Sequence, residues 1–284
     1  MSPIAILFTD LDGTLLDHET YSFDPARPAI HAVQSRRLPI ILTTSKTLPE
    51  VRDINRALHN QAPVIVENGG AMGFPLALSY PFELTAHDEI DDFAIVRFSP
   101  RYVEIRQFIE QQRDEHGFKL QGFGDMTAGQ VARHTGLAHD EAIQARDRLC
   151  SEPFIWQDSD LNLQRFRRAA AEVSLRVTQG GRFYHLMGNT SKAEAMLAMR
   201  NLFTPNDAPA PITIALGDSP NDKDMLQHAD IAVVVMRHDG SHIDGHGIRK
   251  TIKTPEPGPT GWNMAVEQLL DELDDPTAIP QGGS

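Results

Sequence analysis

The chain has 284 residues, of which 40% are apolar, enough to bury a hydrophobic core in one large domain or two smaller ones. Its 26 Lys and Arg residues stand against 39 Asp and Glu residues, and the formal net charge of -13 disfavours a nucleic-acid partner. Cys150 is the single cysteine, which excludes an internal disulfide and favours a reducing compartment. No apolar stretch reaches the ~20 residues that a membrane helix needs, so we expect a cytoplasmic protein with no membrane partner.

Short apolar runs recur along the chain and alternate with helix-like segments. The runs are residues 4–9, 39–44, 63–66, 212–216 and 231–235, and the helix-like segments include 49–60, 191–203 and 221–228. Ser191 and Glu194 have the spacing of a capping box at the start of one such segment. Apolar runs that alternate with helices are typical of a parallel sheet covered by helices on both faces. We therefore predict an α/β fold with a Rossmann-like core.

The pattern changes between residues 86 and 188. Polar helical segments are longer there (101–116, 139–150 and 160–172), and the strands 93–98 and 154–157 are less uniformly apolar. Residues 175–179 and 182–186 alternate on either side of a glycine pair, which is typical of a hairpin. We predict an α+β cap of residues 86–188, inserted into a core of residues 1–85 and 189–273. The polar segment 274–284 is expected to be disordered.

The first apolar run ends at two acidic residues, Asp10 and Asp12. If the extended backbone persists, their carboxylates point to the same side and repel each other. Holding both ionised requires a cation, and hard oxygen ligands favour Mg²⁺ over zinc or copper. Considered alone, such a pair is as consistent with a solvated loop or a helix cap as with a site. Gly13 supplies the backbone freedom for a turn away from the strand.

A second acidic cluster follows the run 212–216. Asp218 and Asp222 are candidate metal ligands, directly or through water, and Asn221 could donate a hydrogen bond to a phosphate oxygen. Two further residues suit the same site. Thr44 ends the second apolar run and offers a hydroxyl to phosphate, although Thr43 and Ser45 compete for that role, and Lys192 begins a helix where its ammonium could neutralise phosphate charge.

These residues together resemble the haloacid dehalogenase superfamily, motif by motif. The first motif is residues 10–14 (DLDGT), the second Thr44, the third Lys192 and the fourth residues 217–222 (GDSPND). The resemblance implies that Asp10 attacks phosphorus to form a phosphoaspartate while Asp12 acts as general acid and base. It also implies an Mg²⁺ ion held by Asp10, the backbone carbonyl of Asp12, Asp218 and Asp222, with phosphate held by Thr44, Lys192 and Asn221. The position of the insertion resembles the subgroup with a large α/β cap, the C2 type.

The resemblance narrows to the mannosyl-3-phosphoglycerate phosphatase family over nearly the whole chain up to about residue 273. It depends on residues 44–47 (TSKT), 67–71 (ENGGA), 122–126 (GFGDM), 151–154 (SEPF), 180–185 (GGRFYH) and 258–263 (GPTGWN). The implied substrate is a phosphorylated sugar-glycerate. Lys46, Asn68 and Arg182 could supply the partners of its sugar hydroxyls and its carboxylate. The glycine pairs near Asn68 and Arg182 are equally consistent with ordinary turns.

Several alternatives stay open on the residues alone. A glucosyl analogue differs by one hydroxyl configuration, and the same scaffold suits general sugar-phosphate phosphatases. A phosphotransferase or mutase would pass phosphate from Asp10 to a second sugar, whereas a catalytically silent binding module is disfavoured because both first-motif aspartates are present. The histidines at 238, 242 and 246 lie among loop residues, which favours a solvated loop over a metal site. Cys150 is expected to be a packing residue of a helix. The sequence leaves the oligomeric state open.

Overall fold

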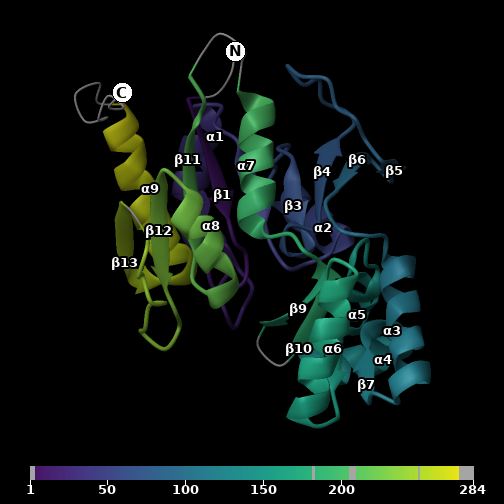
Figure 1. The fold of residues 1–284 in the computed structure, drawn as a ribbon. Coiled ribbons are helices and arrows are strands. Elements are labelled where there is room, and N and C mark those ends of the chain that lie inside the picture. Colours follow the sequence, from purple (N-terminus) through teal and green to yellow (C-terminus); the bar gives the residue numbers. More distant parts are fainter. Residues whose placement is uncertain (1–3, 181–182, 205–208, 249, 275–284) are drawn as a thin grey trace. The chain divides into compact units, whose positions relative to one another are not determined.

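The structure, a computed structural model, describes residues 4–180, 183–204, 209–248 and 250–274 (Figure 1). Its contacts divide the chain into two compact units, Met1–Thr43 with Met196–Ser284, and Thr44–Ala195. We call these unit 1 and unit 2. Within the described ranges, no helix is both long enough and apolar enough to cross a membrane.

Unit 1 contains five parallel strands in the order β13-β12-β11-β1-β2. They are β1 (Ala5–Thr9), β2 (Ile40–Thr43), β11 (Ile212–Gly217), β12 (Ile231–Met236) and β13 (Thr251–Pro257). Every residue of β1 and β2 is buried, as expected for continuous apolar runs in a sheet covered on both faces. The predicted α/β fold is confirmed. The exposed strand β13 had not been predicted because it lacks an apolar run.

The helices of unit 1 are α1 (Arg27–Ser35), α8 (Lys223–His228) and α9 (Gly258–Asp274). Helix α7 (Lys192–Phe203) starts in unit 2 and ends in unit 1, and the hydroxyl of Ser191 accepts a hydrogen bond from the Glu194 N–H, as the capping box predicts. Asp274, expected in a disordered tail, instead ends α9 and forms an ion pair with Arg36. The rest of that tail, residues 275–284, lies outside the described residues.

Unit 2 begins with four strands in the order β3-β4-β6-β5, all antiparallel. They are β3 (Val64–Val66), β4 (Ala71–Pro75), β5 (Asp88–Ile90) and β6 (Phe93–Arg97). Helix α2 (Leu48–Ala57) precedes them and starts with a capping box, in which Thr47 and Glu50 each accept a hydrogen bond from the backbone N–H of the other.

The rest of unit 2 is built on a separate antiparallel sheet, β7-β8-β10-β9, which forms the cap. The strand that the sequence placed in the cap at residues 93–98 lies instead in the other sheet, as β6, where it pairs with β4. Its strands are β7 (Leu120–Gly122), β8 (Ser151–Trp156), β9 (Leu175–Gly180) and β10 (Phe183–Gly188). The helices are α3 (Tyr102–His116), α4 (Ala128–Thr135), α5 (His139–Arg146) and α6 (Asp160–Glu172). Strands β9 and β10 form the predicted hairpin. Arg182 lies outside the described residues.

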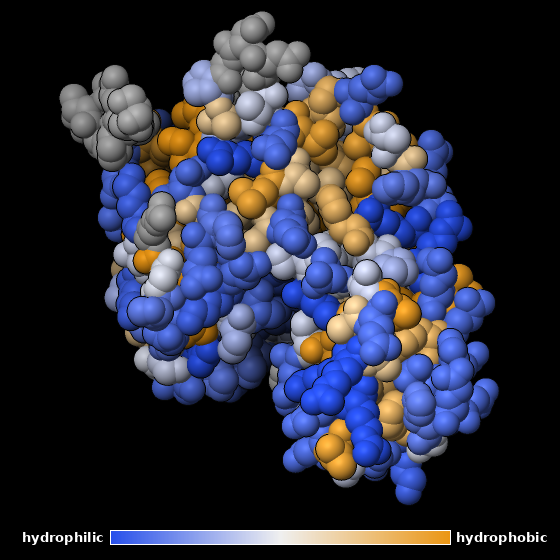
Figure 2. All heavy atoms as spheres, in the orientation of Figure 1, coloured by the Kyte–Doolittle hydropathy of each residue, from blue (hydrophilic) through white to orange (hydrophobic). Residues whose placement is uncertain are grey.

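Two apolar cores lie on the opposite faces of the cap sheet. On one face, Ile105 of α3 and Phe166 of α6 pack with Phe154 of β8. On the other face, Ile155 of β8 packs against a cluster that includes Val131 of α4 and Ala142 of α5. Much of the outward face of α6 is hydrophilic, as Figure 2 shows, although Leu161 near its start is exposed. The buried apolar residues of this helix are Leu163, Phe166 and Ala170.

One prediction of local structure is wrong. Helix α5 ends at Arg146, not at residue 150, so Cys150 lies in the loop that leads into β8. The predicted packing role of Cys150 is supported, because its side chain is fully buried and this burial raises the pKa of its thiol. A Cβ atom on Gly70 would come within 2.6 Å of its Sγ, so glycine is needed beside it.

Candidate active site

The acidic motifs of unit 1 meet because their strands are neighbours. Strands β1 and β11 are parallel, with Thr9 opposite Leu216. The N–H of Asp10 donates to the Leu216 carbonyl over 2.9 Å, which extends the pairing one residue beyond β1. Asp10 and Asp218 thus leave adjacent strands at the same carboxyl edge, where ligands of open α/β sheets bind.

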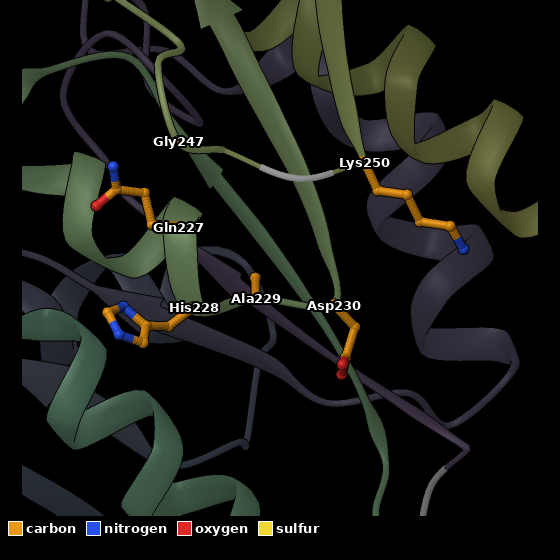
Figure 3. Close-up of a pocket in the computed structure, with 6 residues that line it drawn as sticks. All are labelled: Gln227, His228, Ala229, Asp230, Gly247 and Lys250. Carbon is orange, nitrogen blue, oxygen red and sulfur yellow. The ribbon is translucent and has the colours of Figure 1, made fainter. Parts of the chain in front are cut away.

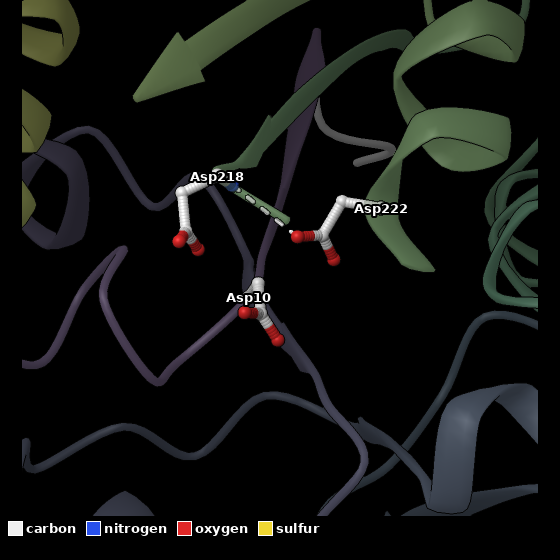
Figure 4. A group of neighbouring side chains, drawn as sticks. All are labelled: Asp10, Asp218 and Asp222. Carbon is white, nitrogen blue, oxygen red and sulfur yellow. Dashed lines mark hydrogen bonds between the residues drawn. The ribbon is translucent and has the colours of Figure 1, made fainter. Parts of the chain in front are cut away.

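Three carboxylates converge at this edge. Asp10, Asp218 and Asp222 each offer an oxygen, and these oxygens all lie within 4.8 Å of one another. Figure 4 shows the three side chains close together, with Asp10 between Asp218 and Asp222 in the view. All three are buried, with at most 9% of the residue exposed. Because three carboxylates this close repel one another strongly when dehydrated, the cluster suggests a metal site, and its hard oxygen donors fit a cation such as Mg²⁺.

Hydrogen bonds fix two of these carboxylates. Thr14 donates from Oγ1 to Oδ1 of Asp218 over 2.7 Å. Oδ2 of Asp222 accepts from the N–H of Asp218 and from both the N–H and the hydroxyl of Ser219. Arg237, from the loop after β12, donates to the backbone carbonyl of Asp218 over 2.9 Å. Such contacts orient metal-binding oxygens before an ion arrives, which favours tight binding.

Two glycines are required by the close packing of this cluster. Gly13 has a φ of +79°, and a Cβ atom there would lie 2.9 Å from Oδ2 of Asp218. At Gly217 a Cβ atom would lie 2.5 Å from the Cβ of Asp222, closer than real Cβ atoms approach one another. The glycines at these positions therefore allow the two acidic loops to come close enough for their carboxylates to converge.

Asp12 is placed differently from the three converging acids. It is partly exposed, and its carboxylate is not part of the cluster. Its backbone pairs with Leu16 in a tight loop, which is closed by hydrogen bonds from the N–H groups of Gly13 and Leu16. Asp12 thus lies in a short loop that starts directly after Asp10. Asn221, also predicted for this site, is exposed on the turn Pro220–Asp222.

The other predicted site residues belong to unit 2. Thr44 is 1% exposed, and its hydroxyl accepts a hydrogen bond from the Lys46 N–H. Lys46 lies 3.9 Å from Glu50 in an ion pair. Lys192 is 2% exposed at the start of α7, which is unusual for lysine. Asn68 lies in a turn directly after β3 and has a φ of +58°.

The candidate residues that sequence reasoning set aside are not members of the carboxylate cluster found among the described residues. His238, His242 and His246 lie in irregular segments, as expected. Among the described residues, none of them belongs to a group of side chains that could hold a metal ion. His238 stacks on His18 with ring centroids 3.9 Å apart. A surface concavity lined in part by Asp230 and Lys250 lies at the amino ends of β12 and β13, where Figure 3 shows side chains that diverge.

Sequence reasoning missed the residues that support the cluster. Thr14 and Ser219 were within the quoted motifs, and their proximity to the aspartates was a usable signal. Arg237 gave no local signal, because its contact with Asp218 spans 19 positions and depends on the pairing of β11 with β12.

Comparison with known proteins agrees with this geometry. A family model described as haloacid dehalogenase-like hydrolase matches residues 7–95. The chain is 37% identical over 270 residues to a glucosyl-3-phosphoglycerate/mannosyl-3-phosphoglycerate phosphatase of Persephonella marina, covering 95% of this chain and 98% of the relative. It is 38% identical to a protein of the same description from Methanococcoides burtonii, covering 93% and 97%.

Solved structures show the same fold at lower identity. One is a phosphatase of the haloacid dehalogenase superfamily from Bacteroides thetaiotaomicron, with a TM-score of 0.65, 19% identity and coverage of 94% and 95%. Another is a sugar phosphatase of subclass IIB, with a TM-score of 0.58, 16% identity and coverage of 93% and 98%. With the near full-length relatives, these findings show that the chain belongs to the haloacid dehalogenase-like hydrolases, in the family of the glucosyl-3-phosphoglycerate/mannosyl-3-phosphoglycerate phosphatases.

Proposed function

We propose that this chain is an Mg²⁺-dependent phosphatase that hydrolyses mannosyl-3-phosphoglycerate to mannosylglycerate and phosphate, and that it also accepts the glucosyl analogue. The observation that carries the proposal is the buried convergence of Asp10, Asp218 and Asp222 at the carboxyl edge of adjacent parallel strands. Relatives that share 37% and 38% identity over nearly the whole chain support this choice of substrate.

In the proposed reaction Asp10 is the nucleophile. One of its carboxylate oxygens attacks phosphorus, the bond between phosphorus and the glycerate oxygen breaks, and Asp12 donates a proton to the departing oxygen. Asp12 then removes a proton from the water that attacks the phosphoaspartate, so that phosphate leaves and both aspartates return to their starting states. The Asp12 carboxylate is not one of the clustered carboxylates, which supports this division of roles, because a carboxyl group that donates a proton should not itself bind the metal.

Asp10, Asp218, Asp222 and the backbone carbonyl of Asp12 would hold the metal ion. The ion, when bound, supplies positive charge that allows an anionic carboxylate to approach an anionic phosphate. The hydrogen bonds from Thr14 and Ser219 keep the acidic ligands oriented toward the ion. The bound ion would also supply the local positive charge that a protein with a formal net charge of -13 needs in order to bind an anionic substrate.

Further residues would bind the substrate. We propose Thr44, Lys192 and Asn221 as ligands of the phosphate oxygens, and Lys46, Asn68 and Arg182 as partners of the sugar and the glycerate carboxylate. The burial of Thr44 and Lys192 supports their part, because lysine is almost never fully buried at positions without a specific role.

A substrate panel is the direct test. Phosphate release is measured with Mg²⁺ from mannosyl- and glucosyl-3-phosphoglycerate, simple hexose phosphates and 3-phosphoglycerate. We expect the two glycosyl compounds to have the highest kcat/KM, whereas a preference for hexose phosphates would contradict the proposed substrate. Asp10→Asn should abolish release from every compound, and a folded variant that retains activity would refute the assignment of Asp10.

The same assay separates hydrolysis from phosphate transfer. With an acceptor sugar added in excess, a hydrolase still gives one free phosphate for each substrate consumed. A phosphotransferase or mutase would instead give a phosphorylated acceptor and a deficit of free phosphate. We expect the first outcome.

A further inference from the structure

The turn that follows β3 has a strained backbone. Glu67, Asn68 and Gly69 are consecutive residues with φ values of +51°, +58° and +88°. Left-handed conformations are unfavourable for residues with side chains, and a run of them persists only where the surrounding structure enforces it. The enforcing contacts here come from distant segments of unit 2, and most of them converge on Glu67.

The carboxylate of Glu67 is fully buried and accepts three hydrogen bonds. The donors are the N–H of Leu149 at 2.6 Å, the N–H of Cys150 at 3.1 Å and the hydroxyl of Ser151 at 2.6 Å. Arg148, itself 8% exposed, lies 3.6 Å away in an ion pair. One side chain therefore ties the end of β3 to the start of β8 in the cap sheet.

The backbone of the same turn contacts the two segments that carry the proposed phosphate ligands. The N–H groups of Asn68 and Glu67 donate to the carbonyls of Thr44 at 2.8 Å and Lys46 at 3.0 Å. On the other side, a Cβ atom on Gly69 would lie 2.2 Å from the carbonyl oxygen of Ser191 and 2.9 Å from the N–H nitrogen of Lys192.

The Gly69 carbonyl adds a further link to the second segment, because it accepts a hydrogen bond from Thr190 over 3.2 Å. Thr44 and Lys192 are separated by 148 positions in the chain, yet the backbones of both adjoin this single turn. A shift of the turn would move both of them together.

We propose that Glu67 is a positioning residue, whose buried carboxylate holds the left-handed turn so that Thr44 and Lys192 are aligned for phosphate before the substrate binds. This inference rests on the proposed function and adds a role that lies outside the phosphate-binding residues themselves. The charge of Glu67 matters as well as its shape, since both carboxylate oxygens accept hydrogen bonds and the amide group of glutamine would set an N–H₂ against a donor.

Glu67→Gln, Ser151→Ala and the matched control Glu152→Gln test the proposal. Glu152 is also a fully buried glutamate of unit 2, but among the described residues its carboxylate interacts with Arg106, Tyr102 and the Gly124 N–H and not with the turn. The readouts are KM and the inhibition constant of inorganic phosphate, because neither changes when part of a sample is merely unfolded.

We expect Glu67→Gln to raise the phosphate inhibition constant and KM about 10-fold, as a displacement of positioned groups does. Ser151→Ala should also raise both constants, but by a smaller factor. If Glu67→Gln does not fold, Ser151→Ala alone tests the positioning role. Glu152→Gln should leave both constants unchanged. Wild-type constants in Glu67→Gln and Ser151→Ala, or an equal shift in Glu152→Gln, would overturn the proposal.

The proposed function can fail separately. If the wild-type protein released no phosphate from any substrate of the panel, the phosphatase assignment would fall. Binding of inorganic phosphate, measured by thermal shift, would then compare the same variants. Weaker binding in Glu67→Gln and Ser151→Ala, but not in Glu152→Gln, would still support the positioning role.

Discussion

Trp262 donates a hydrogen bond from Nε1 to Oγ1 of Thr9 over 3.0 Å, across 253 positions of the chain. Thr9 in turn donates from Oγ1 to the carbonyl of Asp10. Trp262 belongs to α9 and its indole is fully buried, so this hydrogen bond joins α9 to the last residue of β1. Asp10, the proposed nucleophile, is thus held by a two-step chain of hydrogen bonds that begins in α9.

Trp262→Phe should weaken both the fold and the reaction. It removes the hydrogen bond and leaves a small cavity, so we expect the free energy of unfolding to fall by about 1–3 kcal/mol and kcat to fall severalfold. Denaturant titration and steady-state kinetics measure the two effects. Trp156→Phe is the matched control, because Trp156 in the cap donates to an exposed backbone carbonyl and should lose stability without losing kcat.

Thr14→Val should weaken metal binding. The substitution keeps the side-chain shape but removes the hydroxyl that orients Asp218, so we expect the Mg²⁺ concentration for half-maximal activity to rise about 10-fold. Thr14→Ser keeps the hydroxyl and should restore the wild-type value. An unchanged Mg²⁺ requirement in Thr14→Val would show that the hydrogen bond does not tune the site.

Gly217→Ala should disrupt the carboxylate cluster. The added methyl would press against the Cβ of Asp222, so we expect a loss of about 1–3 kcal/mol in the free energy of unfolding and a severe loss of activity. Gly129→Ala is the control. The nearest atom to its Cβ would be 3.9 Å away, within α4, where alanine favours the helix and should leave activity unchanged. Equal effects of the two substitutions would contradict the packing argument.

Asp125 should contribute to the loss of stability of the cap at acid pH. Burial alone would raise the pKa of this carboxyl, but hydrogen bonds from Arg113 and Arg106 outweigh burial and hold its pKa well below the usual range. Since the folded pKa lies below the unfolded value of about 3.9, the stabilisation is complete above that pH and is lost as the pH falls further. Asp125→Asn should therefore flatten the fall in unfolding free energy below about pH 4. Parallel curves for variant and wild type would contradict this role.

The sequence predicted those parts of the site that depend on local pattern. Asp10 and Asp218 each follow an apolar run, and Asp222 lies in the turn after Asp218. Parallel neighbouring strands bring residues at their carboxyl ends to the same edge of the sheet, so this part of the site did not depend on knowledge of side-chain packing. The α/β fold followed from the same runs. The exposed strand β13 and the true end of α5 could not be predicted, because their strand and loop states depend on tertiary contacts more than on periodicity.

Long-range hydrogen bonds were beyond the reach of sequence reasoning. Glu67 and Trp262 stood in recognised motifs, but their partners are 82 to 84 and 253 positions away. No local pattern indicates that a glutamate after a strand will take a left-handed conformation and bury its carboxylate. The roles of such residues depend on which loops the completed fold places beside them.

The convergence of Asp10, Asp218 and Asp222 has a thermodynamic consequence for the whole protein. A cation that binds these oxygens in the folded chain finds no comparable site once the chain unfolds, so mass action makes it a folding ligand as well as a cofactor. At 100 times the dissociation constant, such a ligand adds about 2.7 kcal/mol to stability. The free concentration of the cation would then set two quantities. One is the turnover rate of each folded molecule, and the other is the fraction of molecules that are folded.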